Sequence, residues 1–110
     1  MSFSYNGRVF LTDNEGFLLN KDEWTEDLMF FMAKNLGLTL TEQHKTVINE
    51  VREYYKEYAT TPAMRVLITT LKKKGYSDLA SSVALARLFP DGAAKTAAKL
   101  AGLPKPVKCI

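Results

Sequence analysis

Residues 60–75, TTPAMRVLITTLKKKG, contain the most complete set of helix signals in the chain. Thr61 is a predicted N-cap, and Pro62 takes the first helical position, where its missing N–H is tolerated. Three lysines at 72–74 stand at the negative C-terminal end, and Gly75 follows as a stop. The stretch therefore predicts a helix between Thr61 and Gly75 and indicates a helical domain.

Apolar residues at helical spacing predict four further helices on either side of this one. The first covers residues 23–36, and the second begins after Thr41 as its N-cap. Another runs from Ser77 to about Phe89, and a short last helix covers residues 93–101. Gly102 then ends the last helix, and Leu103 stands where a Schellman cap places an apolar residue.

The N-terminal part of the chain predicts a small β-hairpin. Residues 7–20, GRVFLTDNEGFLLN, form two apolar runs around a turn-forming group that ends in Gly16. We therefore expect a hairpin near residues 8–19. The predicted fold is mostly α: a small helical bundle with a short N-terminal β-hairpin, a helix-turn-helix-like pair and a flexible C-terminal arm. Residues 1–102 form the predicted domain, and residues 103–110 form the arm.

The third and fourth predicted helices, joined by GYS at 75–77, could form a DNA-binding helix-turn-helix. The recognition helix would then be SDLASSVALARLF, residues 77–89, which is mostly apolar and small. Only Arg87 in it is a good reader of base edges. Core packing is the better use of this segment, and a DNA-binding regulator with an incidental cysteine is kept as the alternative function.

Composition and charge limit the classes of protein that remain. The chain has 110 residues, 46% of them apolar, and a single cysteine, which suits one cytosolic domain without an internal disulfide. No apolar run is long enough to span a membrane, and the N-terminus lacks a secretory signal pattern. The net charge is −4 over residues 1–62 and +7 over residues 63–110. The basic half could attract a polyanion or an acidic protein surface, or its lysines could simply solvate helix faces.

Metal and cofactor chemistry have little support in the sequence. The only histidine, His44, lies sixty-five residues from the only cysteine, Cys109, and no helix presents paired ligands. We expect no metal and no cofactor, and we expect His44 to be a solvated surface residue. A Cys-His catalytic pair has no feature that would hold the two residues together.

The single cysteine lies on a tail that two prolines should keep extended. The last residues, LPKPVKCI at 103–110, project at roughly 3 Å per residue in polyproline-like geometry, a reach on the order of 18 Å. Lys105 and Lys108 favour the reactive thiolate of Cys109. Prenylation requires a cysteine four residues from the end, whereas only Ile110 follows Cys109, so a lipid anchor is excluded. The flanking prolines and lysines disfavour a core-packed thiol. An incidental thiol remains open, but thiol or persulfide exchange is favoured.

The chain resembles the DsrC/TusE family along nearly its whole length. The resemblance lies in RLFPDGAAKTAAKLAGLPKPVKCI at 87–110, TPAMR at 61–65 and TDNEGFL at 12–18. AGLPKPVKC is the most specific part. The family is mostly helical with a small hairpin, and its penultimate cysteine accepts sulfur, which implies this role for Cys109. DsrC proteins of dissimilatory sulfur metabolism have a second cysteine where this chain has Ala98, so the resemblance implies no intramolecular disulfide here.

What the resemblance implies is a sulfurtransferase of the TusE branch. Such a carrier receives persulfide sulfur from a TusBCD-type donor complex and passes it to an MnmA-type thiolase with bound tRNA, which makes 2-thiouridine at the wobble position. Lys105 and Lys108 would stabilise anionic sulfur. Arg65 and Arg87 are weaker candidates for steadying the arm or meeting tRNA phosphate, and each could equally be an ordinary surface or helix-capping residue. Direct tRNA contact does not follow from charge.

Overall fold

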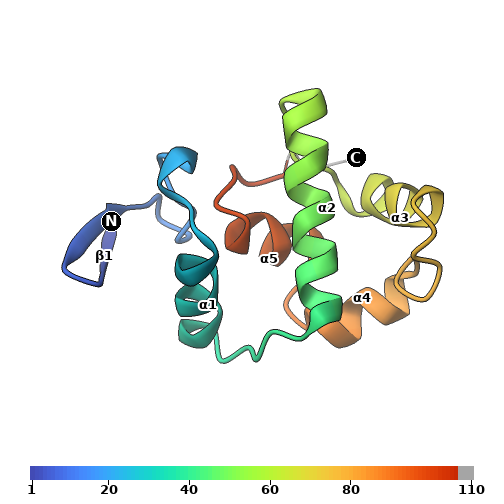
Figure 1. Cartoon of the computed structure of the whole chain (residues 1–110), viewed down its shortest axis with the longest axis horizontal. Helices are drawn as coiled ribbons and strands as arrows, with labels where there is room; N and C mark the ends of the chain where they lie inside the picture. The colour runs from blue at the N-terminus through green and yellow to red at the C-terminus, as the bar shows by residue number, and fades with distance from the viewer. Residues whose placement is uncertain (107–110) are drawn as a thin grey trace.

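The computed structural model describes residues 1–106 and shows helices around one apolar core (Figure 1). The mostly helical fold with a small N-terminal hairpin is confirmed. In chain order the elements are β1 (Ser2–Tyr5), β2 (Arg8–Leu11), the 3-10 helix η1 (Lys21–Glu23), α1 (Glu26–Asn35), α2 (Glu42–Tyr58), α3 (Met64–Lys73), α4 (Ser82–Leu88) and α5 (Ala93–Leu100).

The short helix α5 is the centre of the bundle. It packs against α1, α2, α3 and α4, and it lies behind α2 in the view of Figure 1. Its inner face is made largely of alanines, because Ala93, Ala97 and Ala98 are all buried. Small side chains let the backbones of neighbouring helices approach closely. Ala98 is therefore a core position on this central helix.

The hairpin lies earlier in the chain than predicted. β1 and β2 pair antiparallel from Ser2 opposite Leu11 to Tyr5 opposite Arg8. The turn is Asn6-Gly7, with φ of 53° and 78°, the left-handed pair that a type I′ turn requires. The expected turn at residues 13–16 is present, because the N–H of Gly16 donates to the carbonyl of Asp13 at 3.2 Å and Gly16 has a φ of +88°. It closes only one isolated antiparallel bridge, between Thr12 and Leu18.

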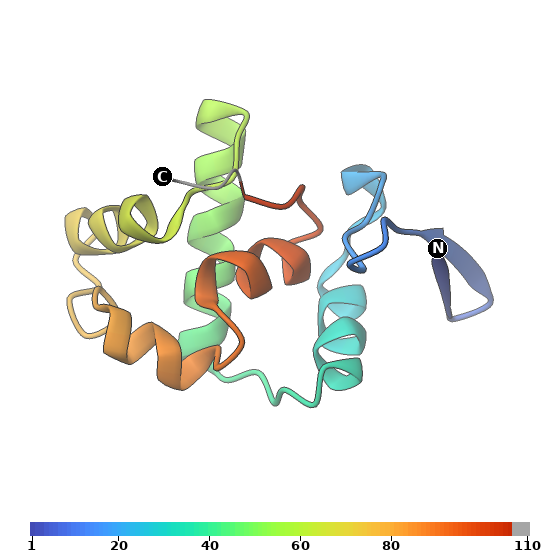
Figure 2. The same cartoon turned by 180° about the vertical axis from the view of Figure 1, so that it is seen from behind.

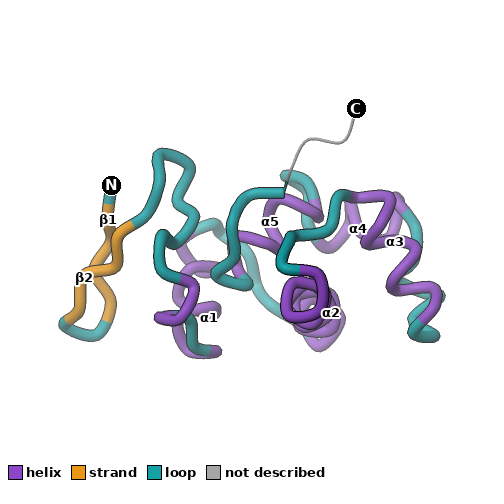
Figure 3. Tube along the Cα trace, turned by 90° about the horizontal axis from the view of Figure 1, so that it is seen from above, coloured by secondary structure: helices purple, strands orange, loops and turns teal. Residues whose placement is uncertain are grey.

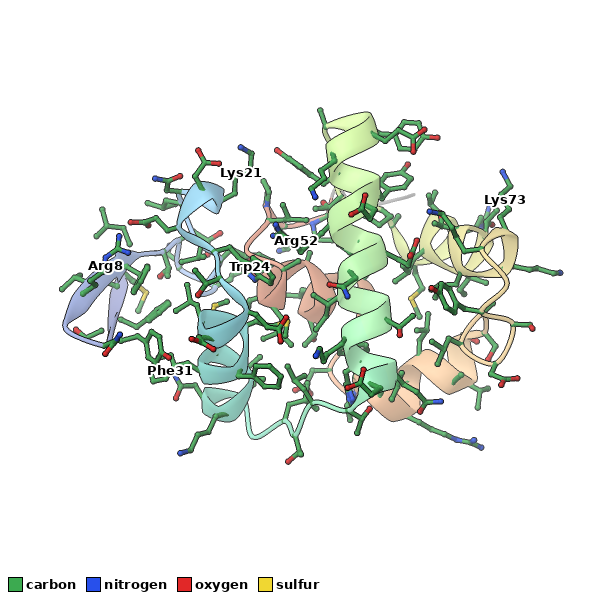
Figure 4. All side chains as sticks on the ribbon, in the orientation of Figure 1. Arg8, Lys21, Trp24, Phe31, Arg52 and Lys73 are labelled. Atoms are coloured by element: carbon green, nitrogen blue, oxygen red, sulfur yellow. The ribbon has the colours of Figure 1, made fainter. Side chains whose placement is uncertain are left out.

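Aromatic contacts attach the hairpin to the helices. The rings of Phe3 and Phe10 stack with centroids 5.3 Å apart, and Tyr5 lies 4.6 Å from the ring of Phe31 on α1. Figure 4 shows Phe31 on the side of α1 that faces the hairpin. A two-stranded hairpin is marginal alone, so these contacts supply the packing that it needs.

Three predicted helix starts were wrong. α1 begins at Glu26 and not at residue 23, because Lys21–Glu23 form η1 and Thr25 is the N-cap of α1. α3 begins at Met64 with Ala63 as N-cap, because Thr61 and Pro62 are buried in an irregular segment before the helix. α4 begins at Ser82, and the hydroxyl of Ser81 accepts from the N–H of Ala84. Ser77, the predicted cap, belongs to a turn instead, where its carbonyl accepts from Ala80. Burial of Thr61 and of Leu79 in these connections outweighs the local cap signals.

His44 is a buried residue, which corrects the expectation of a surface one. Only 6% of it is exposed. Its Nδ1 accepts from the N–H of Thr41 at 3.0 Å, which completes a capping box at the start of α2. Its Nε2 lies 2.7 Å from the carbonyl oxygen of Leu88, so the neutral tautomer with hydrogen on Nε2 satisfies both partners. His44 thus ties the start of α2 to the end of α4.

Candidate functional site

Cys109 and Lys108 lie outside the described residues, so the described part of the site is the root of the arm. Residues 101–106 follow α5 and lead toward the cysteine. In Figure 2 this segment runs to the side of the C-terminal half of α2, and Figure 3 shows its end beside the connection between α2 and α3. The side chains that contact the end of α5 and this segment are Glu15 in the loop before η1, Trp24 directly after η1 and Arg52 on α2.

The cap of α5 starts the arm in a fixed direction. The N–H of Gly102 donates to the carbonyl of Lys99 at 3.1 Å, and the N–H of Leu103 donates to that of Ala98 at 3.0 Å. These two bonds define a Schellman motif, as the sequence predicted. Leu103 is 4% exposed and belongs to the apolar core, so the chain is anchored until this residue.

Trp24 and Arg52 bind the two carbonyls at the end of α5. The indole N–H of Trp24 donates to the carbonyl of Leu100 at 2.7 Å, and the guanidinium of Arg52 donates to that of Ala101 at 2.9 Å. Such terminal carbonyls have no partner within their own helix. We call Trp24 and Arg52 the carbonyl clamp.

The two side chains of the carbonyl clamp also contact each other. The guanidinium carbon of Arg52 lies 3.7 Å from the ring centroid of Trp24, a cation–π distance, and Figure 4 shows Arg52 on α2 pointing toward Trp24. Partial burial lowers the pKa of Arg52, while the nearby Glu53 acts in the opposite direction. The guanidinium remains charged at neutral pH, and a cation is favourable at the negative end of α5.

Gly102 gives the clamp the space that it occupies. The backbone φ at Gly102 is +72°, and a Cβ at this position would lie 2.6 Å from Cδ1 of Trp24. Any larger residue would both strain the backbone and push the indole away. The glycine that ends α5 is therefore also the residue that lets Trp24 reach the carbonyl of Leu100.

Lys105, a predicted supporting residue, pairs with the loop before η1. Its Nζ lies 2.8 Å from Oε2 of Glu15, and Nζ of Lys95 on α5 lies 3.3 Å from Oε1 of the same carboxylate. The hydrogen bonds from Lys105, and then from Lys95, lower the pKa of Glu15. All three groups are exposed, so this contact is easily exchanged with a partner or with salt.

The structure does not bring Arg65 and Arg87 to the clamp. Arg65 lies on α3 and lines a groove of about 410 Å³ between α2 and α3, together with Tyr54 and Tyr58. Arg87 is exposed on α4, which lies away from the end of the described arm in Figures 1 and 2. Within residues 1–106 neither arginine forms an ion pair.

Sequence reasoning missed both members of the carbonyl clamp. Trp24 was expected only as one apolar residue of the first helix, and Arg52 was not singled out. The one available signal was spacing, because Arg52 follows Ile48 by four residues and precedes Tyr55 by three. An arginine on the apolar side of a helix needs a partner in the folded protein. The identity of that partner, 49 residues away, could not be read from the sequence.

The described residues offer neither a metal centre nor a membrane span. Between residues 1 and 106 no three histidine, cysteine or acidic side chains cluster in a way that could hold a metal ion. In the same range no helix is long and apolar enough to cross a membrane. The polar groups that contact the root of the arm are hydrogen-bond donors, lysines and the carboxylate of Glu15.

Comparison with known proteins assigns the chain to a family of sulfur proteins. Residues 4–110 match the family model described as DsrC like protein. The chain is 46% identical to sulfurtransferase TusE of Yersinia pseudotuberculosis and 43% identical to that of Escherichia coli K12. The first alignment covers 96% of this chain and 98% of the relative, and the second covers 96% and 97%.

Solved structures agree with this assignment. The NMR structure of Allochromatium vinosum DsrC matches with a TM-score of 0.89 at 43% identity, and both chains are covered completely. The crystal structure of the oxidized γ-subunit of dissimilatory sulfite reductase, DsrC, from Archaeoglobus fulgidus matches with a TM-score of 0.85 at 33% identity, again over all of both chains. The chain belongs to the DsrC-like family. Sulfur relay is the function that this membership supports, and its curated relatives are sulfurtransferases.

Proposed function

We propose that this chain is a sulfurtransferase that carries persulfide sulfur on Cys109. In this proposal the donor is a TusBCD-type complex, and the acceptor is an MnmA-type thiolase that holds tRNA and forms 2-thiouridine at the wobble position. A sulfur-relay carrier acts together with other proteins, and we propose these two as its partners. We also propose that residues 1–102 form the domain, that residues 103–110 form the arm, and that the protein is cytosolic.

The observation that carries the proposal is the extent of the family match. The family model runs to residue 110, so it includes the arm and Cys109. The curated relatives named sulfurtransferase TusE are matched over nearly their full lengths. The family assignment also favours sulfur relay over the DNA-binding alternative. Among the described residues, the root of the arm is held by the Schellman motif and the carbonyl clamp, which suits a thiol presented to another protein.

The proposed reaction transfers one sulfur atom in two balanced steps. The thiolate of Cys109 attacks the outer sulfur of the donor persulfide, the donor S–S bond breaks, and the donor cysteine leaves as a thiolate. Cys109 then holds the persulfide. A cysteine thiolate of the acceptor attacks the terminal sulfur, and Cys109 leaves as a thiolate. No external oxidant or reductant is needed in either step.

Lys105 and Lys108 have a supporting role in this proposal. A lysine close to sulfur favours the anionic form that attacks and leaves. The ammonium of Lys105 pairs with Glu15 in the described structure, so it would exchange this partner for anionic sulfur or for an acidic group of the docked protein. Arg65 and Arg87 are kept only as weak candidates for partner or tRNA contact.

Mass spectrometry of the intact protein tests the proposal directly. The chain is incubated with a cysteine desulfurase, free cysteine and the TusBCD-type donor, and we expect a gain of one sulfur atom that reductant removes. The added sulfur should lie on the C-terminal peptide. Cys109→Ser should abolish the gain and leave the thermal stability nearly unchanged.

A displaced thiol provides the matched control. Lys34 is exposed on α1, so the double variant Cys109→Ser with Lys34→Cys has one accessible thiol away from the arm. We expect no transfer from the donor complex to this variant. Sulfur carried by Cys109→Ser would overturn the assignment of the carrier residue, and efficient loading at position 34 would show that the arm is not required.

A further inference from the structure

We propose that Trp24 and Arg52 are positioning residues for sulfur transfer between proteins. By binding the last carbonyls of α5, the carbonyl clamp fixes the direction in which the arm leaves the domain. It thereby decides where Cys109 meets a donor or acceptor protein. This inference rests on the proposed sulfur-carrier function, and it adds two residues that do not touch the reacting sulfur.

The contacts converge on one short segment from distant parts of the chain. Trp24 follows η1 and binds Leu100 across 76 residues, while Arg52 lies in α2 and binds Ala101 across 49. Each donates to a different one of two successive carbonyls, at 2.7 and 2.9 Å. Two bonds from separate elements fix an orientation, whereas one bond would leave a pivot.

The choice of residue types goes beyond what packing needs. Burial disfavours the charged form of Arg52 and lowers its pKa, so placing this side chain here costs desolvation free energy. An apolar residue would fill the space without that cost. The planar guanidinium is suited to stack on the indole of Trp24 and donate to Ala101 at the same time.

The segment after the clamp continues along the same side chains. Leu103, Arg52 and Tyr55 line a cavity of about 180 Å³. Pro104 and Tyr55 line a neighbouring cavity of about 280 Å³ with residues of the loop before η1. The path from Gly102 to Pro104 is thus bordered by α2 on one side, and the carbonyl clamp stands at its beginning.

A small change in the direction of the chain at this root becomes a large displacement of the thiol. Six residue steps separate Leu103 from Cys109, a span on the order of 18 Å in extended geometry. If the arm keeps the extended geometry that its two prolines favour, a tilt of about 20° at the root moves the sulfur by about 6 Å. Reacting atoms must approach to about 3–3.5 Å, and a misplacement of about 1 Å can slow a reaction a hundredfold. A freely diffusing persulfide can reach the thiol from many directions and should tolerate the tilt.

Two sulfur donors therefore separate positioning from thiol chemistry. The variants are Arg52→Met, which removes the donors but keeps a long side chain, and Trp24→Phe, which keeps a ring but removes the N–H. We expect each to reduce the second-order rate constant with the TusBCD-type complex by about tenfold or more. With glutathione persulfide, the rate constants should stay within about twofold of wild type. Arg52→Lys should restore part of the rate, because it can still donate one hydrogen bond.

Lys45→Met is the matched control. It removes the same charge two helical turns earlier on α2, where the lysine pairs with Glu26 on α1 and lines neither of the two cavities beside the arm. We expect both its rate constants to equal those of wild type. Trp24 is the only tryptophan, so its fluorescence in Arg52→Met reports directly whether the clamp has opened. Circular dichroism checks that each variant is folded.

The outcomes separate a failure of the proposed function from a failure of the positioning role. If wild type accepts sulfur on Cys109 from neither donor, the proposed function fails. If wild type accepts it from both, and Arg52→Met and Trp24→Phe transfer as fast as wild type, only the positioning role is overturned. Equal losses with both donors in folded variants would also overturn it, because the clamp would then act on the thiol or on the fold in general.

Discussion

Gly102 is the residue on which the course of the chain after α5 depends. Its φ is +72°, and a Cβ would lie 2.6 Å from Cδ1 and 2.8 Å from Cβ of Trp24. Left-handed backbone is costly for alanine, and the indole would have to move as well. We expect Gly102→Ala to lower the free energy of unfolding by about 2–4 kcal/mol, measured by urea denaturation.

A second glycine separates the two causes of this loss. Gly37 has the same φ of +72°, but nothing lies within 4 Å of the position that a Cβ would take. Gly37→Ala should therefore lose only the backbone term, about 1 kcal/mol. If Gly102→Ala lost no more than Gly37→Ala, the close approach of Trp24 would have no energetic consequence.

The ion pair between Glu15 and Lys105 should depend on pH. Hydrogen bonds from Lys105 and Lys95 lower the pKa of Glu15 below its ordinary value of 4.5. A lowered carboxyl pKa means that the contact is complete above pH 4.5 and is lost as pH falls through the lower, folded-state value. We expect the NMR shift of the Lys105 amide to titrate in this acidic range and to become flat in Glu15→Gln.

Glu53→Gln is the control for this titration, since Glu53 pairs with Lys56 within α2. The Lys105 shift should titrate in this variant as in wild type. A Lys105 titration that persisted unchanged in Glu15→Gln would show that another carboxylate controls the arm at this point.

Single residues were predictable where the signal was local. Gly102 and Leu103 were placed correctly, because a Schellman motif is written in consecutive residues. Trp24 and Arg52 were missed, because their partners are backbone carbonyls 76 and 49 residues away. His44 was predicted at the surface from its polar neighbours in sequence, but its ring binds the carbonyl of Leu88 on another element.

At the scale of elements, helix identity was predicted better than helix limits. α2 starts after Thr41 as expected, because the capping box is local. The starts of α3 and α4 were wrong, because Thr61 and Leu79 are buried in the segments that precede these helices. The hairpin was misplaced because Asn6-Gly7, a strong turn signal, was overlooked in favour of Gly16.

His44 should be the most sensitive polar residue at the junction of α2 and α4. Replacement by alanine leaves the N–H of Thr41 and the carbonyl of Leu88 without their partner and removes a ring that packs edge-on against Phe89. We expect His44→Ala to lower the free energy of unfolding by about 2–4 kcal/mol in urea denaturation.

Two further variants at this junction give the comparison. His44→Gln can still offer an N–H toward Leu88 and should recover part of the loss. Gln43→Ala, at the exposed neighbouring position, should change the stability by less than about 0.5 kcal/mol. A His44→Ala protein as stable as Gln43→Ala would mean that the link between α2 and α4 is not needed.

At the scale of the whole molecule, composition predicted a mostly helical protein but not its centre. The last helix reads as a short, weak segment of alanines and lysines, yet α5 packs against all four other α-helices of the described chain. Alanine burial contributes little per residue, so the sequence pattern alone gave this helix no special weight. Its central place matters for function, because the arm is a direct continuation of the element that the rest of the domain surrounds.

Shortened chains should locate the boundary between the domain and the arm. Removal of residues 104–110 takes away Pro104 and Lys105, which are exposed, and leaves Leu103 in the core. We expect the far-ultraviolet circular dichroism and the urea midpoint to stay close to those of the full chain, while sulfur acceptance is lost. Removal of residues 101–110 also deletes Leu103 and the carbonyl that Arg52 binds. This shorter chain should lose about 3–5 kcal/mol.

The contrast between the two shortened chains decides whether anchoring ends at Leu103. If both were as stable as the full chain, the Schellman motif and the carbonyl clamp would hold the arm without supporting the fold. If both unfolded, residues 104–110 would be needed for the core, and a tail that leaves the domain to deliver sulfur would be excluded. A stable chain ending at Leu103 and an unstable one ending at Leu100 would separate the two tasks, because folding would need the root of the arm and sulfur transfer would need the rest.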